Sequence, residues 1–134
     1  MSGEESGGSP LVGRAALGLA VVVGRSMEPT LSAGDRLLVS YRRAPRVGDV
    51  VLVRFVDGTL AVKRAVERRA DRTGRRGWWV LSDNPAEGVD SRHRGVVVDE
   101  AVVGVVRCRV WPRPRPVGQR SGKRERRGNL SPGE

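Results

Sequence analysis

The chain has 134 residues, enough for one domain, and its 25 lysines and arginines outnumber 15 acidic residues to give a formal charge of +10. A single cysteine, Cys108, excludes an intrachain disulfide and a cysteine-based metal cluster. Only three Trp, one Tyr and one Phe accompany the positive charge, so the sequence predicts no basic and aromatic platform for stacking nucleic-acid bases.

The N-terminal region begins with a polar stretch and continues with an apolar one. Residues 1–9 are small and polar, and they cannot bury enough apolar surface to offset the entropy of ordering, so we expect disorder there. Residues 11–23 are apolar, but the longest uncharged run has ten residues, whereas a membrane-spanning helix needs about 20. We therefore expect a soluble, cytoplasmic protein without a transmembrane anchor, and peripheral membrane association stays open.

Short runs of β-forming residues recur along the middle of the chain, separated by turn residues. The predicted strands are residues 21–23, 36–40, 50–56, 59–67, 78–81, 96–98 and 102–111. Asp57-Gly58 between two such runs is a strong hairpin signal, and the charged residues 68–77 are predicted to be a loop or a hairpin tip. Residues 82–95 are predicted to be a loop, and no segment has a convincing helical period of ten or more residues. The sequence predicts a mainly β, compact domain with a coiled sheet.

The C-terminal segment, residues 112–134, is rich in Pro, Gly and Arg. It carries seven basic and two acidic residues. We interpret it as a solvated, disordered tail, with an arm for nucleic acid or an anionic membrane as the alternative. The predicted organisation is a disordered N-terminus at residues 1–9, one domain at 10–111 and a basic disordered tail at 112–134.

Ser26 is a candidate nucleophile because of its place in the chain. It follows a β-branched run, and Pro29 fixes its own φ and biases Glu28 away from a helix, so a rigid turn at a strand end is predicted. A serine nucleophile needs a base. The only histidine, His93, lies in a predicted loop, and the sequence contains no Gly-x-Ser-x-Gly elbow that would support a Ser–His–Asp triad.

Lys63 can supply the base if its amine is neutral. It lies between Ala61 and Ala65 in an apolar run, and an apolar surround lowers the pKa of a lysine. A neutral amine near Ser26 could take the hydroxyl proton. Strand alternation, however, puts the neighbouring Arg64 on a face with other apolar residues, so periodicity leaves open which face is buried. A solvent-facing strand lysine is the alternative.

Five short motifs follow one another in the order found in the type I signal peptidase family. The segment Ser-Met-Glu-Pro-Thr-Leu from Ser26 resembles the nucleophile box of that family, and Lys63-Arg64 resembles its general-base box. The remaining likenesses are Gly34-Asp35, Gly48-Asp49-Val50-Val51, and Asp83-Asn84 followed by Asp90-Ser91-Arg92 and Gly95. The resemblance spans about residues 20–110. It implies a serine peptidase with a catalytic domain of the signal peptidase or LexA-like type.

The resemblance also implies roles for single residues. Ser26 would be the nucleophile, Lys63 the general base, and the Ser26 backbone N–H part of the oxyanion hole. The expected supporting residues are Asp83, Asn84, Asp90, Ser91 and Arg92. A plain structural salt bridge is the alternative for Asp90 and Arg92. No metal and no organic cofactor are implied.

Three positions depart from the family pattern. Gly24 stands where some relatives have a hydroxyl donor, and Gly88 stands where some have a serine near the lysine. Ser82 replaces the usual glycine before Asp-Asn. The resemblance therefore implies a leaner oxyanion hole, and it leaves open which group orients Lys63.

Within the family, residues 63–69, 77–81 and 83–85 resemble the anchorless nickel-type superoxide dismutase maturation proteases of actinobacteria. This likeness implies a protein substrate, the dismutase precursor, from which an N-terminal propeptide would be removed. Nickel would belong to that substrate. The alternatives are processing of secretory signal peptides and LexA-like self-cleavage, although 25 residues before Ser26 give no room for a helix-turn-helix domain. A non-enzymatic nucleic-acid-binding module is a further alternative, and the sequence predicts no oligomeric state.

Overall fold

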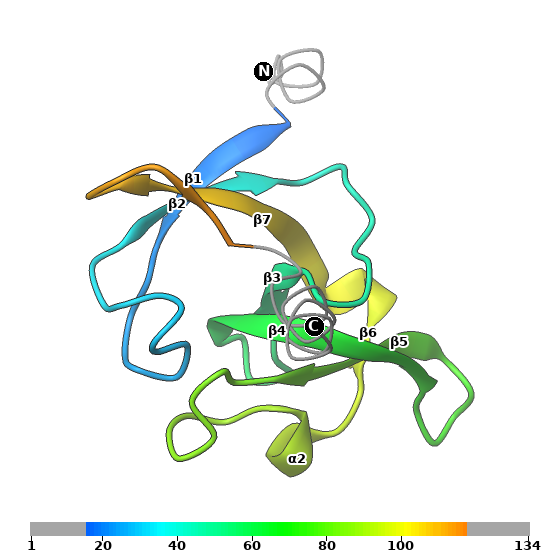
Figure 1. Cartoon of the computed structure of the whole chain (residues 1–134). Coiled ribbons are helices and arrows are strands. Elements are labelled where there is room, and N and C mark those ends of the chain that lie inside the picture. The colour runs from blue at the N-terminus through cyan, green and yellow to red at the C-terminus, as the bar shows by residue number, and fades with distance from the viewer. Residues whose placement is uncertain (1–15, 118–134) are drawn as a thin grey trace, which may run out of the picture.

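A computed structural model describes residues 16–117, which form a mainly β domain (Figure 1). The strands are β1 (Leu17–Val21), β2 (Arg36–Ser40), β3 (Val50–Arg54), β4 (Leu60–Ala70), β5 (Arg76–Leu81), β6 (Val97–Val98), β7 (Val102–Trp111) and β8 (Arg115–Pro116). The helical elements are the single turn α2 (Ser91–Arg94) and the 3-10 turn η1 (Asp99–Ala101). The predicted fold class, a mainly β domain with a coiled sheet, is confirmed.

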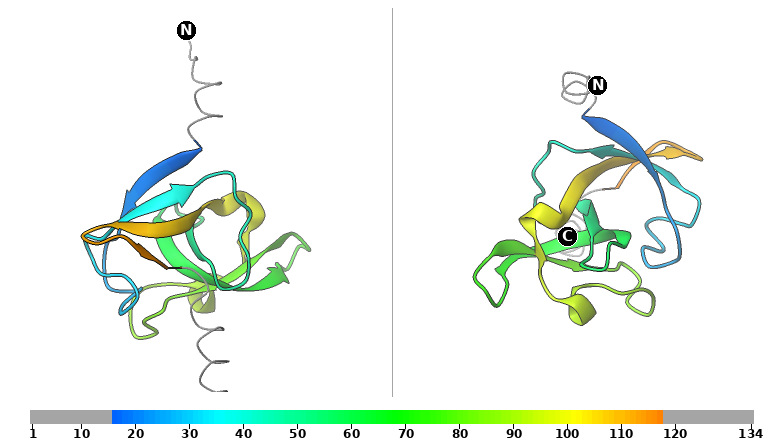
Figure 2. Two further views of the ribbon diagram at one scale, coloured as in Figure 1. Left: turned by 45° about the horizontal axis from the view of Figure 1, so that its top comes forward. Right: turned by 180° about the vertical axis from the view of Figure 1, so that it is seen from behind.

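All the strands belong to one antiparallel sheet, in the order β1-β2-β7-β3-β4-β5-β6, with β8 paired to β7. The long strand β7 pairs with β2 along one part and with β3 along another. Register shifts occur in the β2–β7, β3–β7 and β4–β5 pairings. Such irregularities bend strands and increase their twist. The sheet accordingly coils around the domain, as the two further views show (Figure 2).

The coiled sheet has apolar clusters on both of its faces. The first contains Val22, Met27, Leu31, Leu37, Val39, Val50, Leu52, Val106 and Val117, and the second contains Val51, Val53, Phe55, Ala65, Trp78, Val80, Val97 and Val105. Strand β3 contributes alternate side chains to the two clusters, so four consecutive residues of this strand are buried. An unbroken run of apolar residues is what a strand covered on both faces requires.

Strands β2 and β7 have the predicted bounds, β3 to β6 differ from theirs by one to three residues at an end, and two regions need a physical explanation. Strand β1 covers residues 17–21 instead of 21–23, because Leu17–Val21 pair residue for residue with β2 and the chain then leaves the sheet. Residues 68–77 form the end of β4, a turn and the start of β5, so the β4–β5 hairpin is longer than predicted. Its charged arm is stabilised by Arg69, which stacks on Trp79 at 4.0 Å, and its turn is fixed by Asp71, which accepts hydrogen bonds from the Thr73 and Arg75 N–H groups.

The folded part of the chain continues beyond Trp111, where we expected the domain to end. Strand β8 pairs with β7 through Cys108 and Arg109, and Val117 is 3% exposed in the first apolar cluster. The predictions of disorder for residues 1–9 and for the tail from residue 118 onward lie outside the described residues. Within residues 16–117, no helix has the length and apolar character needed to cross a membrane.

Candidate active site

Ser26 lies in a turn that begins soon after β1 ends. Gly24 adopts φ +81°, a conformation that favours glycine and allows the chain to turn away from the sheet. Met27 and Leu31 are each 1% exposed and anchor the turn in the first apolar cluster. Asn84 holds the turn from the other side: its N–H donates to the Ser26 carbonyl at 2.8 Å, and its Nδ2 donates to the Arg25 carbonyl at 3.1 Å. The backbone around Ser26 is thus fixed by packing and by hydrogen bonds.

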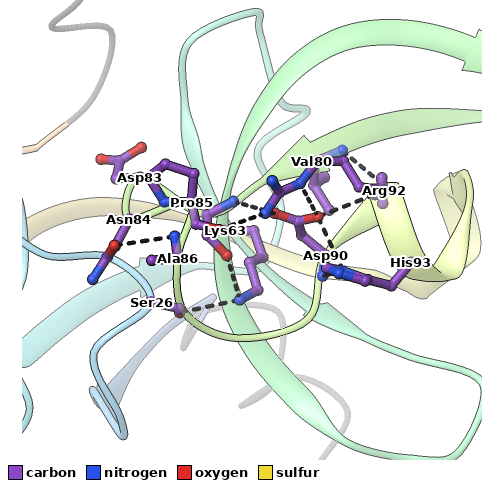
Figure 3. A network of polar contacts seen from close by, with 12 residues as sticks. Ser26, Lys63, Val80, Asp83, Asn84, Pro85, Ala86, Asp90, Arg92 and His93 are labelled. Atoms are coloured by element: carbon purple, nitrogen blue, oxygen red, sulfur yellow. Dashed lines mark hydrogen bonds and ion pairs between the residues drawn. The ribbon is translucent and has the colours of Figure 1, made fainter.

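Lys63 lies in the middle of β4, and its amine reaches the Ser26 hydroxyl. The Nζ–Oγ distance is 3.0 Å (Figure 3), and a second hydrogen bond of 3.1 Å joins Nζ to Oγ of Ser82. Lys63 is 3% exposed, so the side chain does not face solvent. Burial lowers the pKa of Lys63 from its ordinary value, the charge of Asp90 opposes this, and the charge of Arg92 lowers the pKa further. The alternative of a solvent-facing strand lysine is wrong.

Arg64, the next residue on β4, points to the other face of the sheet and is also buried. Its Nε and Nη2 donate to both carboxylate oxygens of Asp83 at 2.9 and 2.8 Å, and its Nη1 donates to the Gly48 carbonyl at 2.7 Å. The Thr30 hydroxyl donates to the same Asp83 carboxylate at 2.5 Å. Arg64 and Asp83 therefore connect the lysine strand to the turn that carries Ser26.

Asp90 is completely buried and organises the end of β5. It accepts hydrogen bonds from the Ser82 N–H at 2.9 Å and from Nε and Nη2 of Arg92 at 3.0 and 3.1 Å. Burial by itself raises the pKa of Asp90, but the hydrogen bonds from Arg92 and from the Ser82 N–H outweigh it and bring the pKa to about 2. Ser91 accepts a hydrogen bond from the Val80 N–H at 2.9 Å. Asp90 and Ser91 thus fix the backbone on either side of Leu81.

His93 forms its side-chain hydrogen bond within α2 and not with the dyad formed by Ser26 and Lys63. It lies in α2, where its Nδ1 accepts a hydrogen bond from the Asp90 N–H and closes the capping box of that short helix. Among residues 16–117, no group of three or more His, Cys, Asp or Glu side chains is arranged to hold a metal ion.

Gly88 closes one side of the dyad. A Cβ atom placed on it would lie 2.7 Å from the Ser26 Cβ and 3.2 Å from the Lys63 amine, and its φ is +77°. Both observations favour glycine, because a side chain would collide with Ser26 and strain the backbone. A serine at this position, as in some signal peptidases, does not fit this arrangement without movement of Ser26.

A cleft of about 860 Å³ opens beside Ser26 and Lys63. Its lining is mostly apolar and includes Leu19, Val21, Leu60, Val62 and Val89. Strand β1 is an edge of the sheet, and Leu19 and Val21 are both more than half exposed on it. An extended peptide could therefore lie along an apolar path that passes the hydroxyl of Ser26.

The fold and this geometry agree with the comparison with known families. The profile of a family described as Peptidase S24-like matches residues 6–106, which is most of the chain. The chain belongs to this family of serine peptidases. A search of curated proteins found no significant match. The predicted class, a serine peptidase of the LexA and signal peptidase type, is supported at this level.

The structure brings the two principal predicted residues, Ser26 and Lys63, within hydrogen-bond distance. The five supporting residues lie in the segment between β5 and the end of α2, where Asn84 holds the Ser26 turn and Asp90 holds Ser82. Sequence reasoning gave no role to three residues that the structure puts into the same network: Thr30, Arg64 and Ser82. The signal available for Ser82 was its departure from the family pattern, but a departure alone does not tell which side chain the hydroxyl meets.

Proposed function

We propose that the protein is a serine endopeptidase in which Ser26 is the nucleophile and Lys63 is the general base. One observation carries the proposal: a buried lysine amine lies 3.0 Å from a serine hydroxyl at the wall of a peptide-sized cleft. A buried lysine can lose its proton near neutral pH. An arginine at position 63 could not act in this way, because a guanidinium remains protonated in proteins.

The first half of the reaction is acylation. The neutral amine of Lys63 takes the proton of the Ser26 hydroxyl, and Oγ attacks the scissile carbonyl to form a C–O bond. Within the described residues, no group accepts a hydrogen bond from the Ser26 N–H, which can therefore donate to the carbonyl oxygen as it gains negative charge. The C–N bond then breaks, the Lys63 ammonium gives its proton to the leaving amine, and the acyl group stays on Ser26.

The second half is deacylation. Neutral Lys63 takes a proton from a water molecule that attacks the acyl ester, and the ammonium returns this proton to Ser26 as the C–O bond breaks. The products are a carboxylic acid and an amine, and both side chains regain their starting state. No cofactor takes part in this cycle.

For the substrate, we propose a nickel-type superoxide dismutase precursor, from which the protein removes the N-terminal propeptide. The support is the likeness of three segments of this sequence, residues 63–69, 77–81 and 83–85, to the proteases that mature this dismutase. An N-terminal propeptide can enter the cleft as an extended chain. The apolar lining favours apolar side chains in that chain.

The test is the intact mass of such a precursor after incubation with the protein. Loss of one N-terminal fragment with the wild type, and no loss with Ser26→Ala or Lys63→Ala, supports both the dyad and the substrate. If the precursor stays uncut while the enzyme is folded, the proposed substrate is wrong. Parallel incubations with a secretory precursor and with the enzyme alone then show whether signal-peptide processing or self-cleavage takes its place.

A further inference from the structure

The amine of Lys63 has two hydroxyl neighbours and needs a defined orientation between them. Oγ of Ser26 lies at 3.0 Å and Oγ of Ser82 at 3.1 Å. A neutral amine has one lone pair and two N–H bonds. Lys63 can take a proton from Ser26 only when the lone pair points at the Ser26 hydroxyl, so the N–H bonds must point elsewhere. A group that accepts one of these N–H bonds would hold the productive orientation.

We propose that Ser82 is the positioning residue for Lys63: its hydroxyl oxygen accepts one N–H of the Lys63 amine and directs the lone pair of that amine toward Ser26. This inference rests on the proposed function, because it assigns a partner to the general base of the dyad. Ser82 contacts the base and does not act on the substrate. It is 8% exposed and is not among the residues that line the cleft.

Ser82 is itself held firmly, as a positioning residue must be. Its N–H donates to the buried carboxylate of Asp90 at 2.9 Å. The next residue, Asp83, is clamped by Arg64 and donates its N–H to Sδ of Met27 at 3.4 Å. The hydroxyl of Ser82 therefore extends from backbone that is fixed on both sides. Because the backbone on both sides is fixed, the hydroxyl of Ser82 keeps a constant geometry in its hydrogen bond to Lys63.

The opposite side of the dyad cannot supply the same group. Gly88 lies so close to Ser26 that a side chain on it would collide with the nucleophile. The chain thus has glycine where a side chain would obstruct the dyad and serine where a hydroxyl reaches the lysine. Two of the three departures from the family pattern, Gly88 and Ser82, are consistent with a positioning hydroxyl that comes from the end of β5.

The composition of the chain permits a direct test on Lys63. The sequence contains 23 arginines but only two lysines, Lys63 and Lys123. Protein labelled with ¹³C-lysine therefore gives two Cε signals, which Lys123→Arg assigns. A hydrogen bond to the ammonium form favours that form, so Ser82→Ala should lower the pKa of Lys63 and leave the titration of Lys123 unchanged. Ser82→Thr, which keeps the hydroxyl, should restore the wild-type titration.

The matched control is Ser40→Ala. Ser40 is another buried serine, at the end of β2 and outside the cleft lining, so its removal should leave the Lys63 signal in place. Circular dichroism of each variant confirms that it is folded. An unchanged or raised pKa of Lys63 in folded Ser82→Ala would overturn the proposal, and so would an equal shift in Ser40→Ala.

Kinetics supply a second readout with the precursor that the wild type cleaves. Loss of orientation should reduce kcat by roughly 10- to 100-fold in Ser82→Ala with an unchanged KM, because the hydroxyl does not touch the substrate. A rise in KM with unchanged kcat would contradict a positioning role. The titration needs no substrate, so absence of cleavage by the wild type counts against the proposed function alone, and the Lys63 signal still decides the role of Ser82.

Discussion

Arg64 and Asp83 form a bidentate ion pair in which the two side chains are only 6% and 10% exposed. Arg64 is adjacent to Lys63 in the sequence, and Asp83 is adjacent to Asn84, whose N–H holds the Ser26 carbonyl. The pair therefore fixes β4, which carries Lys63, relative to the turn that carries Ser26. The ion pair lies on the face of β4 opposite to Lys63, so it does not take up space next to the dyad.

Replacement of Asp83 by Ala should destabilise the protein strongly. It leaves the buried guanidinium of Arg64 without its two carboxylate contacts, and breaking a buried pair in this way costs about 3 to 5 kcal/mol. The free energy of unfolding in urea measures the loss. Glu67→Ala is the control, because Glu67 pairs with Arg69 at the surface and its loss should change stability by less than about 1 kcal/mol. Similar losses in the two variants would contradict this assignment.

The rate of cleavage should rise with pH along a limb set by Lys63. Burial lowers the pKa of Lys63, so the neutral amine becomes available at a lower pH than for an ordinary lysine with a pKa of 10.5. Below the pKa in the folded protein, the ammonium cannot accept the Ser26 proton and the rate falls. The measurement is kcat/KM against pH, under conditions in which chemistry limits the rate. A flat profile from neutral to alkaline pH would refute the base role of Lys63.

Replacement of Lys63 by Met should abolish cleavage and also stabilise the protein. A buried amine with a lowered pKa binds its proton less tightly in the folded than in the unfolded chain. By linkage, the folded state is disfavoured below that lowered pKa, and stability recovers as the pH rises toward 10.5. Met has a similar length and no charge, so we expect a gain of about 1 kcal/mol at neutral pH. Thermal unfolding tests this, and a lower Tm for Lys63→Met would count against it.

Replacement of Gly88 by Ala should reduce activity by at least about tenfold, because the new Cβ would displace Ser26 from Lys63. Gly74→Ala is the matched control. Gly74 also has a positive φ, +92°, but a Cβ on it meets no atom within 4 Å. Both variants therefore share a backbone strain of about 1 kcal/mol, and only Gly88→Ala should lose activity. Equal kinetics for the two variants would show that Gly88 does not confine the dyad.

The sequence predicts a large part of the fold because each strand carries a local pattern. Residues 36–40 and 102–111 are strands with the bounds predicted from their β-forming runs, since turn residues delimit them. The burial of Lys63 was not predictable from alternation. Residues 63–65 are all buried, because the coiled sheet covers both faces of β4 at this point.

Some parts of the candidate site are also encoded by local sequence patterns, and others depend on contacts between distant residues. The motif around Ser26 and the Lys63-Arg64 pair are local in sequence, so their candidate roles could be inferred before the structure was known. The contact between Ser82 and Lys63 joins residues 19 positions apart, and it depends on the register of β4 with β5. The close approach of Gly88 to Ser26 depends on the path of a loop. No local pattern encodes either distance.

In the proposed reaction, the amine of Lys63 accepts the proton of the Ser26 hydroxyl. The most direct test is the pKa of Lys63, measured from its Cε signal, beside the pKa of the ascending limb of kcat/KM in the same protein. We predict that the pKa of Lys63 lies below the ordinary lysine value of 10.5 and that it coincides with the kinetic value. A Lys63 pKa at the ordinary value of 10.5, or a kinetic pKa that differs clearly from that of Lys63, would contradict this prediction.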